Sequence, residues 1–312
     1  MKAIAQCLSH SPAVNLRPLD HEREQVVRGV IEDSKNALRA FDPEVVVVFG
    51  PDHYNGFFYN MMPPFCVGER AFGIGDYGTL TGALNVDAEA AHALHAYLLS
   101  KNFDAAVSYD MHIDHGFTQC LDQLFDFQPR FVPVFINCLA HPIASCARTI
   151  DFGAMVGRFF EASGKRTAFI GSGGLSHDAP LPKIDELPED AKNRIIQWRL
   201  LTPAERAQRE KRTMDAADEF AAGRSTLAKL NPEWDQKMMA QIGKGSWSEL
   251  MALEDAEIAL AGGRSAHEIR TWLAAYSALN AFGSYHVEQS IYLEVPEWIV
   301  GYGALRARTA VS

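Results

Sequence analysis

Cysteine is scarce in this chain of 312 residues, which has only five, an odd number, and no CxxC pair. That count indicates neither a disulfide framework nor a thiolate zinc site, and it predicts reduced, mostly buried thiols in a cytoplasmic protein. Long hydrophobic runs are lacking as well, since none approaches the roughly 20 residues that a membrane span requires. The opening segment, MKAIAQCLSH, is too short and too polar to be a secretory signal. We therefore expect no membrane partner.

Positive charge is in deficit, with 29 Lys and Arg against 39 Asp and Glu and a formal net charge of -10. Such a field disfavours a nucleic-acid backbone or an anionic membrane surface as a partner. A small anionic substrate is not excluded, because a local basic pocket can overrule the global field. Low-complexity tracts, Gly/Ser linkers and internal repeats are missing too. The hydrophobic fraction of 47% is ordinary for a globular chain.

Short β-rich runs alternate with helical runs, which is the pattern of a layered α/β fold. The run EVVVVF is continuously apolar, as in a strand covered on both faces. Strands are expected at Ala3–Leu8, Glu44–Phe49, Ala105–Tyr109, Phe131–Ile136, Thr167–Gly171 and, as a closing pair, Tyr285–Val295 and Trp298–Leu305. Helices are expected at Asp20–Phe41, Asp87–Ser100, Phe117–Phe127, Ile143–Ala162 and Ser265–Phe282.

The stretch from about residue 180 to 262 is mostly helical in pattern and more polar, with charged segments such as ERAQREKR. It retains Trp198, Trp234 and Trp247, which favours packing against the core over a role as a linker. We therefore predict one domain over residues 1–312 with a helical excursion in its C-terminal half, in preference to two domains.

Four of the eleven histidines occupy equivalent places: His10, His53, His115 and His177 each follow a β-rich run through a Gly-, Pro-, Asp- or Ser-rich turn. In open α/β sheets, ligand sites gather outside the carboxyl ends of the strands. If the strands are parallel neighbours, the four imidazoles meet in one crevice. A single turn histidine is more often a capped or solvated residue, but four in equivalent positions favour a site.

Two further histidines, His112 and His141, stand in loops near the expected crevice and are weaker candidates for substrate contact. Gly73–Gly78 matches GxGxxG, yet it neither follows a clear strand nor opens a helix, so it predicts a tight turn over the site and no dinucleotide. In Gly171-Ser-Gly-Gly174 we expect close backbone packing and positive φ angles that present His177.

Five ordered motifs make the sequence recognisable: CLSHSP, VVVVFGPDHYN, MHIDHGF, GSGGLSHD and SAHEIRTW. In order and spacing they resemble the class III extradiol ring-cleaving dioxygenases, relatives of the protocatechuate 4,5-dioxygenase catalytic subunit. The resemblance covers nearly the whole chain. It is strongest to members that act on 3-(2,3-dihydroxyphenyl)propionate and its cinnamate analogue.

The resemblance implies a single α/β domain with a central mixed sheet flanked by helices, usually in a homo-oligomer. It also implies an iron(II) ion held by His10, His53 and Glu268, with His115 and His177 as acid/base residues. Two imidazoles and one carboxylate leave coordination positions open for a small catecholic substrate and O2. We assign His177 as the proton acceptor when the catechol binds, and His115 as the proton donor when the ring opens.

Several alternatives stay open at this point. Ser265-Ala-His-Glu268 also reads as a capping box, in which Glu268 would serve the helix and no metal. Two histidines and a glutamate suit catalytic zinc too, so a zinc-dependent hydrolase is an alternative enzyme. A non-enzymatic metal-binding scaffold is a third hypothesis. For a carboxylate on the substrate, Arg270 and Arg17 are the candidates that the sequence offers.

Overall fold

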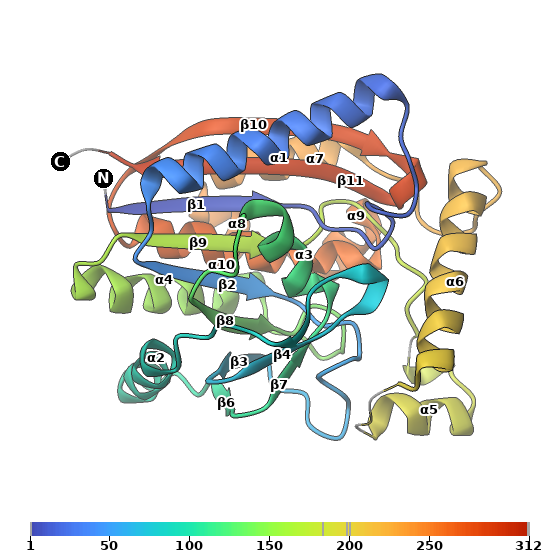
Figure 1. Cartoon of the computed structure of the whole chain (residues 1–312), viewed down its shortest axis with the longest axis horizontal. Coiled ribbons are helices and arrows are strands. Elements are labelled where there is room, and N and C mark those ends of the chain that lie inside the picture. The colour runs from blue at the N-terminus through green and yellow to red at the C-terminus, as the bar shows by residue number, and fades with distance from the viewer. Residues whose placement is uncertain (1, 183, 198, 200, 311–312) are drawn as a thin grey trace.

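An eight-stranded mixed sheet forms the centre of the computed structural model, which describes residues 2–182, 184–197, 199 and 201–310 (Figure 1). The strand order is β10-β11-β1-β9-β2-β8-β3-β6. The strands β1, β9, β2 and β8 run parallel, and β11 and β3 flank them in antiparallel pairs. The single α/β domain with a central mixed sheet is therefore confirmed. In the order of the sheet, the strands span Tyr285–Val295, Val300–Thr309, Ala3–Leu8, Thr167–Ser172, Val45–Gly50, Phe131–Ile136, Phe65–Gly68 and Ala106–Ser108.

The central strands are buried on both faces, which explains why their sequences are continuously apolar. Alternate side chains divide between two cores: Ala3, Ala5 and Cys7 join one, and Ile4 and Leu8 join the other. The helices α2, α4 and α10 cover the first core, and α1 and α3 cover the second (Figure 1). In that order these helices span Ala88–Ser100, Cys146–Ser163, Ile269–Asn280, His21–Phe41 and His115–Leu124.

Aspartate caps decide where three of these helices begin, because Asp20, Asp87 and Asp114 precede α1, α2 and α3. Asp20 caps α1 at the expected place. The side chain of Asp114 accepts the backbone N–H of Gly116, so α3 begins at His115 and not at Phe117, where we expected it. That expectation was wrong because it took Asp114 as part of a loop. His115 is consequently the first residue of a helix.

A second, three-stranded sheet was not expected from the sequence. Its order is β5-β4-β7, with bounds Thr81–Ala83, Ala71–Ile74 and Met111–Ile113. The segment 110–114, expected to be a loop, thus contains a strand. The strand expected to lead into it is β6, which lies at the far edge of the large sheet. The pattern missed β3, β4, β5 and β7 because runs of three or four residues do not show a clear period of two.

The helices and turns between β9 and β10 include no strand in the described part of the chain. Trp234 and Trp247 pack against the first core, as expected for an excursion on that core, whereas Trp198 lies outside the described residues. A capping box between Thr202 and Glu205 starts α6. In Figure 1, α6 stands across the end of the sheet toward which β1, β9 and β2 point. The elements are η2 (Ile184–Glu186), α5 (Glu189–Ile196), α6 (Pro203–Ala221), α7 (Pro232–Lys244), α8 (Trp247–Met251) and α9 (Asp255–Gly262).

The helix expected at Ser265–Phe282 is divided. A 3-10 turn, η3 (Arg264–Glu268), precedes α10, so Glu268 lies at the junction of the two. Another 3-10 turn, η4 (Pro296–Trp298), joins β10 to β11. Both turns reach the end of the sheet where the site is found.

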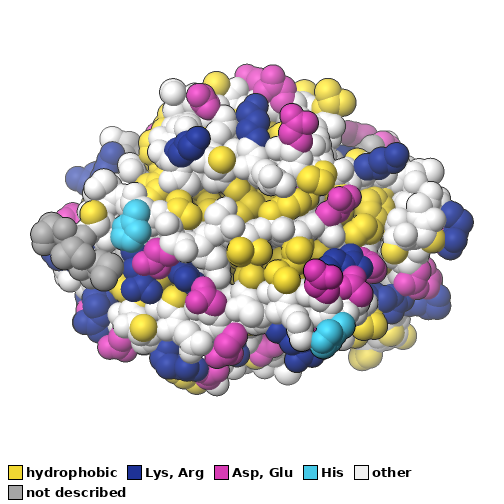
Figure 2. Space-filling model, turned by 90° about the horizontal axis from the view of Figure 1, so that it is seen from above, with side chains coloured by type: hydrophobic (Ala, Val, Ile, Leu, Met, Phe, Trp, Pro, Cys, Tyr) yellow, Lys and Arg dark blue, Asp and Glu magenta, His cyan; other side chains and the backbone are white. Residues whose placement is uncertain are grey.

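All five cysteines are unpaired and buried, as their number predicted. Figure 2 shows the face at the β10 edge of the sheet, where a band of hydrophobic side chains runs between side chains of both charge signs. Within the described ranges, no helix is both long and apolar enough to span a bilayer.

Candidate active site and metal centre

Three of the turn histidines reach one crevice because their strands are neighbours. β1, β9 and β2 are adjacent and parallel, and the chain leaving their carboxyl ends carries His10, His177 and His53. His115 arrives by a different route, from β7 and the start of α3. Its ring lies 5.3 Å from the His10 ring and 4.4 Å from the His53 ring, measured between centroids. The predicted convergence is confirmed, although the strand expected to deliver His115 was wrong.

Glu268 lies between the histidines and is fully buried. Its Oε1 atom is 3.1 Å from His53 Nε2. Its Oε2 atom is 3.3 Å from His10 Nε2 and 3.5 Å from His177 Nε2. One carboxylate from the end of η3 therefore faces the inner nitrogen atoms of three imidazoles.

The capping-box alternative for Glu268 is wrong. The η3 turn has no side-chain cap, and the Ser265 hydroxyl instead accepts the backbone N–H of Ala179. Glu268 ends the 3-10 turn and so does not occupy the third position of a helix. Its side chain is consequently directed at the histidines.

The glycine-rich loop before His177 packs directly against this turn. A Cβ atom on Gly173 would lie 2.6 Å from the Glu268 carbonyl oxygen, and one on Gly174 would lie 2.0 Å from the His177 ring. The expected close packing is confirmed. Positive φ angles were also expected and are wrong, because neither glycine has one. Lack of a side chain is thus what these positions require.

Each of the four imidazoles has its outer nitrogen, Nδ1, engaged by the protein. This arrangement fixes the ring orientation and turns Nε2 inward, as second-layer partners of metal-binding histidines do. The Nδ1 distances are 3.1 Å from His10 to Ser172 Oγ, 3.1 Å from His53 to Asp114 Oδ2, 2.6 Å from His115 to Asp76 Oδ2 and 2.9 Å from His177 to Leu175 O.

Burial and charge act in opposite directions on the protonation of the cluster. Burial lowers the pKa of His10 to about 3, so this imidazole is neutral at physiological pH. Burial also opposes charge on Glu268, but the surrounding histidines outweigh it and hold the pKa of the carboxyl well below its usual range. For His53, burial is outweighed by Asp114 and Glu268, which raise its pKa. His53 must therefore release a proton before it can bind a cation.

Two aspartates, Asp114 and Asp76, hold histidines in position, a role that the sequence reasoning gave to neither; it considered Asp114 only as a substitute ligand for Glu268. Asp114 is fully buried and accepts hydrogen bonds from the backbone N–H and Nδ1 of His53 and from the Asn55 side chain. Asp76 accepts both the backbone N–H and Nδ1 of His115. Asp76 belongs to the GxGxxG match, and the expected turn over the site is confirmed, because Tyr77 lies edge-on to His115. The acid inside this glycine-rich turn was the available signal.

More than one donor set could hold a metal. Ligand atoms of His10, His53 and His115 all lie within 4.8 Å of one another. Glu268 offers the anionic alternative to His115, with its carboxylate oxygens facing His10 and His53. Its Oε2 atom is buried, and neither His10 Nε2 nor His177 Nε2 forms a well-directed hydrogen bond with it. That unsatisfied atom favours the set that contains Glu268.

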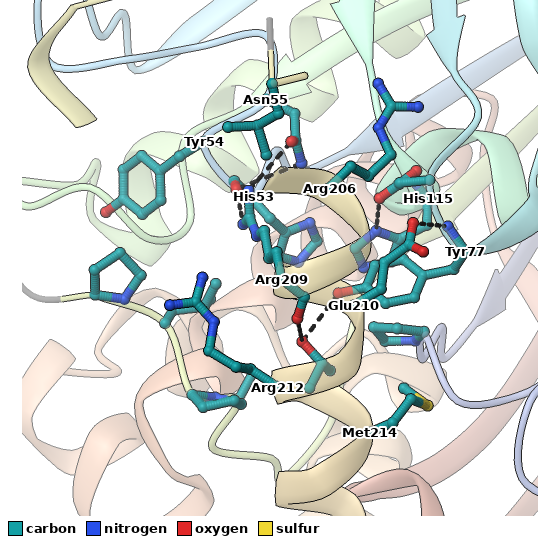
Figure 3. Close-up of a pocket in the computed structure, with 18 of the residues that line it drawn as sticks. His53, Tyr54, Asn55, Tyr77, His115, Arg206, Arg209, Glu210, Arg212 and Met214 are labelled. Atoms are coloured by element: carbon teal, nitrogen blue, oxygen red, sulfur yellow. Dashed lines mark hydrogen bonds and ion pairs between the residues drawn. The ribbon is translucent and has the colours of Figure 1, made fainter. Parts of the chain in front are cut away.

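A cavity of about 450 Å³ opens beside the histidines. This size suits a small-molecule ligand. Apolar and aromatic side chains line much of it, among them Phe58, Tyr77 and Trp298. Helix α6 forms another wall, and Figure 3 shows it beside His53 and His115. The histidines and α6 thus enclose one space.

The weaker sequence candidates lie outside this cavity. His112 stacks on Phe72, and His141 lies against His267. The two arginines suggested for binding a substrate carboxylate do not line the cavity either. They are Arg270, fully buried and bonded to Asp255 and to the backbone of Ala144, and Arg17, paired with Asp218. The arginines that do line the cavity all belong to the helical excursion.

The fold and site agree with comparison to known proteins. Residues 4–303 match the model of a family described as the catalytic LigB subunit of aromatic ring-opening dioxygenase. The chain belongs to this family. It is 42% identical over 312 residues, 99% of each chain, to a protein of Escherichia coli strain SMS-3-5 named 2,3-dihydroxyphenylpropionate/2,3-dihydroxicinnamic acid 1,2-dioxygenase. The protein of that name from strain K12 is similar to the same extent. Membership favours a ring-opening dioxygenase over the zinc hydrolase and the non-enzymatic scaffold.

Proposed function

We propose that the chain uses iron(II) and O2 to cleave a catechol ring beside its two hydroxyls. The proposed substrates are 3-(2,3-dihydroxyphenyl)propionate and 2,3-dihydroxycinnamate, which give ring-fission acids of the hydroxy-oxo-nonadienedioate type. Similarity over 99% of the chain to enzymes named for these compounds supports this choice. The observation that carries the reaction is the buried Glu268 carboxylate, 3.3 Å from His10 Nε2 and 3.1 Å from His53 Nε2.

The residues present fit an iron(II) ion. Two imidazole nitrogens and one carboxylate are the donors associated with non-haem iron(II) oxygenases. The buried Oε2 atom of Glu268 lacks a well-directed hydrogen bond, a costly state that a cation would relieve. We assign His10, His53 and Glu268 as ligands. Iron(II), when bound, supplies the open coordination positions and the electron transfer to O2 that ring cleavage requires.

Two histidines outside this ligand set handle protons. His177 donates through Nδ1 to the Leu175 carbonyl, so its Nε2 atom is left to accept a proton from a catechol hydroxyl. Asp76 holds His115 through Nδ1, which leaves His115 Nε2 to donate a proton to a substrate oxygen as the ring opens. Both imidazoles line the cavity. Each such group contributes typically about 10²- to 10⁴-fold to the rate.

We further propose that residues 1–312 work as one catalytic domain, because the assigned ligands come from positions as distant as His10 and Glu268. A cytoplasmic location and a homo-oligomer remain predictions. Light scattering on the purified chain tests the oligomer, and the mass of a monomer would contradict it.

Anaerobic reconstitution tests the proposed reaction. Protein stripped of metal is loaded with iron(II), mixed with 3-(2,3-dihydroxyphenyl)propionate and then exposed to air. We expect a yellow product and consumption of one O2 per catechol. Zinc should occupy the site without turnover, because zinc has no redox chemistry. Full activity in a metal-stripped or zinc-only preparation would show that the proposed reaction is wrong.

A further inference from the structure

The charged segment ERAQREKR forms the part of α6 that faces the cavity. Its three arginines at spacings of three residues, Arg206, Arg209 and Arg212, all line the cavity. Residues three apart lie on neighbouring turns of one helix face. A chain with a formal net charge of -10 thus places three guanidinium groups in a row against its candidate active site.

No carboxylate in the described part of the chain forms an ion pair with any of these three arginines. The acids that line the cavity have other partners. Asp76 accepts from His115, Glu205 pairs with Arg199, and Glu210 accepts the backbone N–H of Tyr77. Arg206 and Arg209 are half-buried, and cations in such surroundings are normally matched by anions. The wall formed by α6 therefore has a positive charge that a ligand can neutralise.

Two of the arginines are already engaged in holding α6 in place. Arg206 donates to the carbonyl of Ile74, next to the turn that carries Asp76. Arg209 donates to the carbonyl of His53 and to the Asn55 side chain. Both contacts use uncharged acceptors, and both tie α6 to the loops that position the histidines. These contacts keep both guanidinium groups from moving to bind a substrate.

Arg212 differs from the other two. It lines the cavity, its side chain is exposed, and no hydrogen bond or ion pair engages it within the described ranges. In Figure 3 it extends from α6 beside Arg209 and Glu210.

We propose that Arg212 binds the carboxylate at the end of the substrate side chain, so the site selects catechols that bear an acidic tail. This inference rests on the proposed function. A guanidinium presents two parallel N–H groups that match both oxygens of a carboxylate. The ring then lies toward the histidines while its tail reaches the α6 wall.

Binding to the metal-free protein tests Arg212 independently of turnover. The probe is 3-phenylpropionate, which keeps the acidic tail but lacks both hydroxyls, measured by titration calorimetry. Arg212→Gln should weaken binding about 10- to 100-fold, the scale of a charge-assisted hydrogen bond. Lys211→Gln is the matched control, because it removes the same charge from the neighbouring position of α6, outside the cavity lining. Equal affinities in the two variants would overturn the proposal.

Kinetics on the iron-loaded enzyme distinguish a wrong Arg212 assignment from a wrong proposed function. The readout is the ratio of kcat/KM for 3-(2,3-dihydroxyphenyl)propionate to kcat/KM for 3-propylcatechol, which has a neutral tail. Arg212→Gln should lower this ratio about 10- to 100-fold, and Arg212→Lys should lower it less, because it keeps the charge but loses the bidentate geometry. An unchanged ratio with both catechols cleaved overturns the Arg212 assignment alone. Failure of the parent enzyme to cleave either catechol overturns the proposed function.

Discussion

The two ends of the same parallel strands hold their charges in opposite surroundings. At the amino ends of β2 and β9, Arg166 pairs with Asp42 and Glu44, and the three side chains are 42%, 86% and 46% exposed. At the carboxyl ends, Glu268 is 0% exposed and faces His10, which is 4% exposed. Water screens the first group, whereas the second group is left to interact within itself.

This difference shows that burial, more than residue type, decides which charges can do chemistry. An exposed ion pair is worth about 0–1 kcal/mol and leaves its members close to their ordinary behaviour. In the buried cluster, desolvation lowers the pKa of His10 to about 3, which leaves a neutral imidazole available as a ligand at neutral pH. The contrast can be tested by making equivalent changes at both ends.

Glu268→Gln should have the largest effect, because it removes the one carboxylate that faces His10 and His53. Loss of an outer-layer partner alone costs about 10- to 100-fold in metal affinity, so loss of a ligand should exceed that range. Iron content after anaerobic reconstitution and the rate of O2 uptake measure it, beside a thermal melt. The control is Glu44→Gln, the same change at the exposed end. Near-native iron and rate in Glu268→Gln would exclude the ligand role.

The histidines should divide into two groups. His10→Ala and His53→Ala should lose the iron itself. His115→Ala and His177→Ala should keep the iron but lose about 10²- to 10⁴-fold in turnover, the usual scale for a general acid or base. His92→Ala, on the surface of α2, is the control, and it should change neither quantity. Loss of iron from a correctly folded His115→Ala protein would show that His115 is an iron ligand, in place of Glu268 or another of the assigned ligands.

Asp76→Asn should have an intermediate effect. The change keeps the size of the side chain but weakens the bond of 2.6 Å that orients His115. We expect turnover to fall about 10- to 100-fold, the range seen when a residue that orients a histidine is lost. Iron content should stay at the parent level, measured on the same preparation. A parallel loss of iron would mean that Asp76 acts on the metal site and not through His115.

Glu297→Gln should have a small, pH-dependent effect on stability. Hydrogen bonds from Arg23 hold the pKa of the Glu297 carboxyl below its ordinary value. A lowered carboxyl pKa adds stability above the ordinary pKa, and that stability is lost as the pH falls through the lowered value. The melting temperatures of parent and variant should therefore differ most near neutral pH. The corresponding difference in the free energy of unfolding should be no more than about 1 kcal/mol. A difference that grows toward pH 3 would have the wrong sign.

Arg166→Ala should have the smallest effect. It breaks the exposed pairs with Asp42 and Glu44 at the amino ends of the strands. Stability should change by less than about 1 kcal/mol, and iron content and turnover should remain at the parent level. Denaturant unfolding and the O2-uptake assay measure these quantities. A change of several kcal/mol would show that these exposed ion pairs contribute more to stability than their exposure predicts.

Much of the architecture was predictable from local pattern. The continuous apolar runs of β1, β2, β8 and β9 predicted buried strands, because parallel strands covered on both faces require them. The neighbouring positions of β1, β9 and β2 made three of the four turn histidines meet as expected, whereas His115 reaches them from β7 and α3. Glu268 was different. Its own segment left a capping box as an equal alternative, and only resemblance to a family favoured a ligand.

The sequence by itself therefore determined the layered α/β class, the buried strands and the histidines at their ends, since these depend on short-range periodicity and on strands ending in turns. Only the tertiary structure decided which acids position these histidines and which arginine of the excursion faces the cavity. Asp76 lies in the turn between β4 and β5, Asp114 caps α3, and Arg212 lies on α6 of the excursion. The histidine partners of the two aspartates lie far away in the chain, and hydrogen bonds between such distant positions leave no periodic signal. For that reason the positions of these three side chains could be found only after the chain had folded.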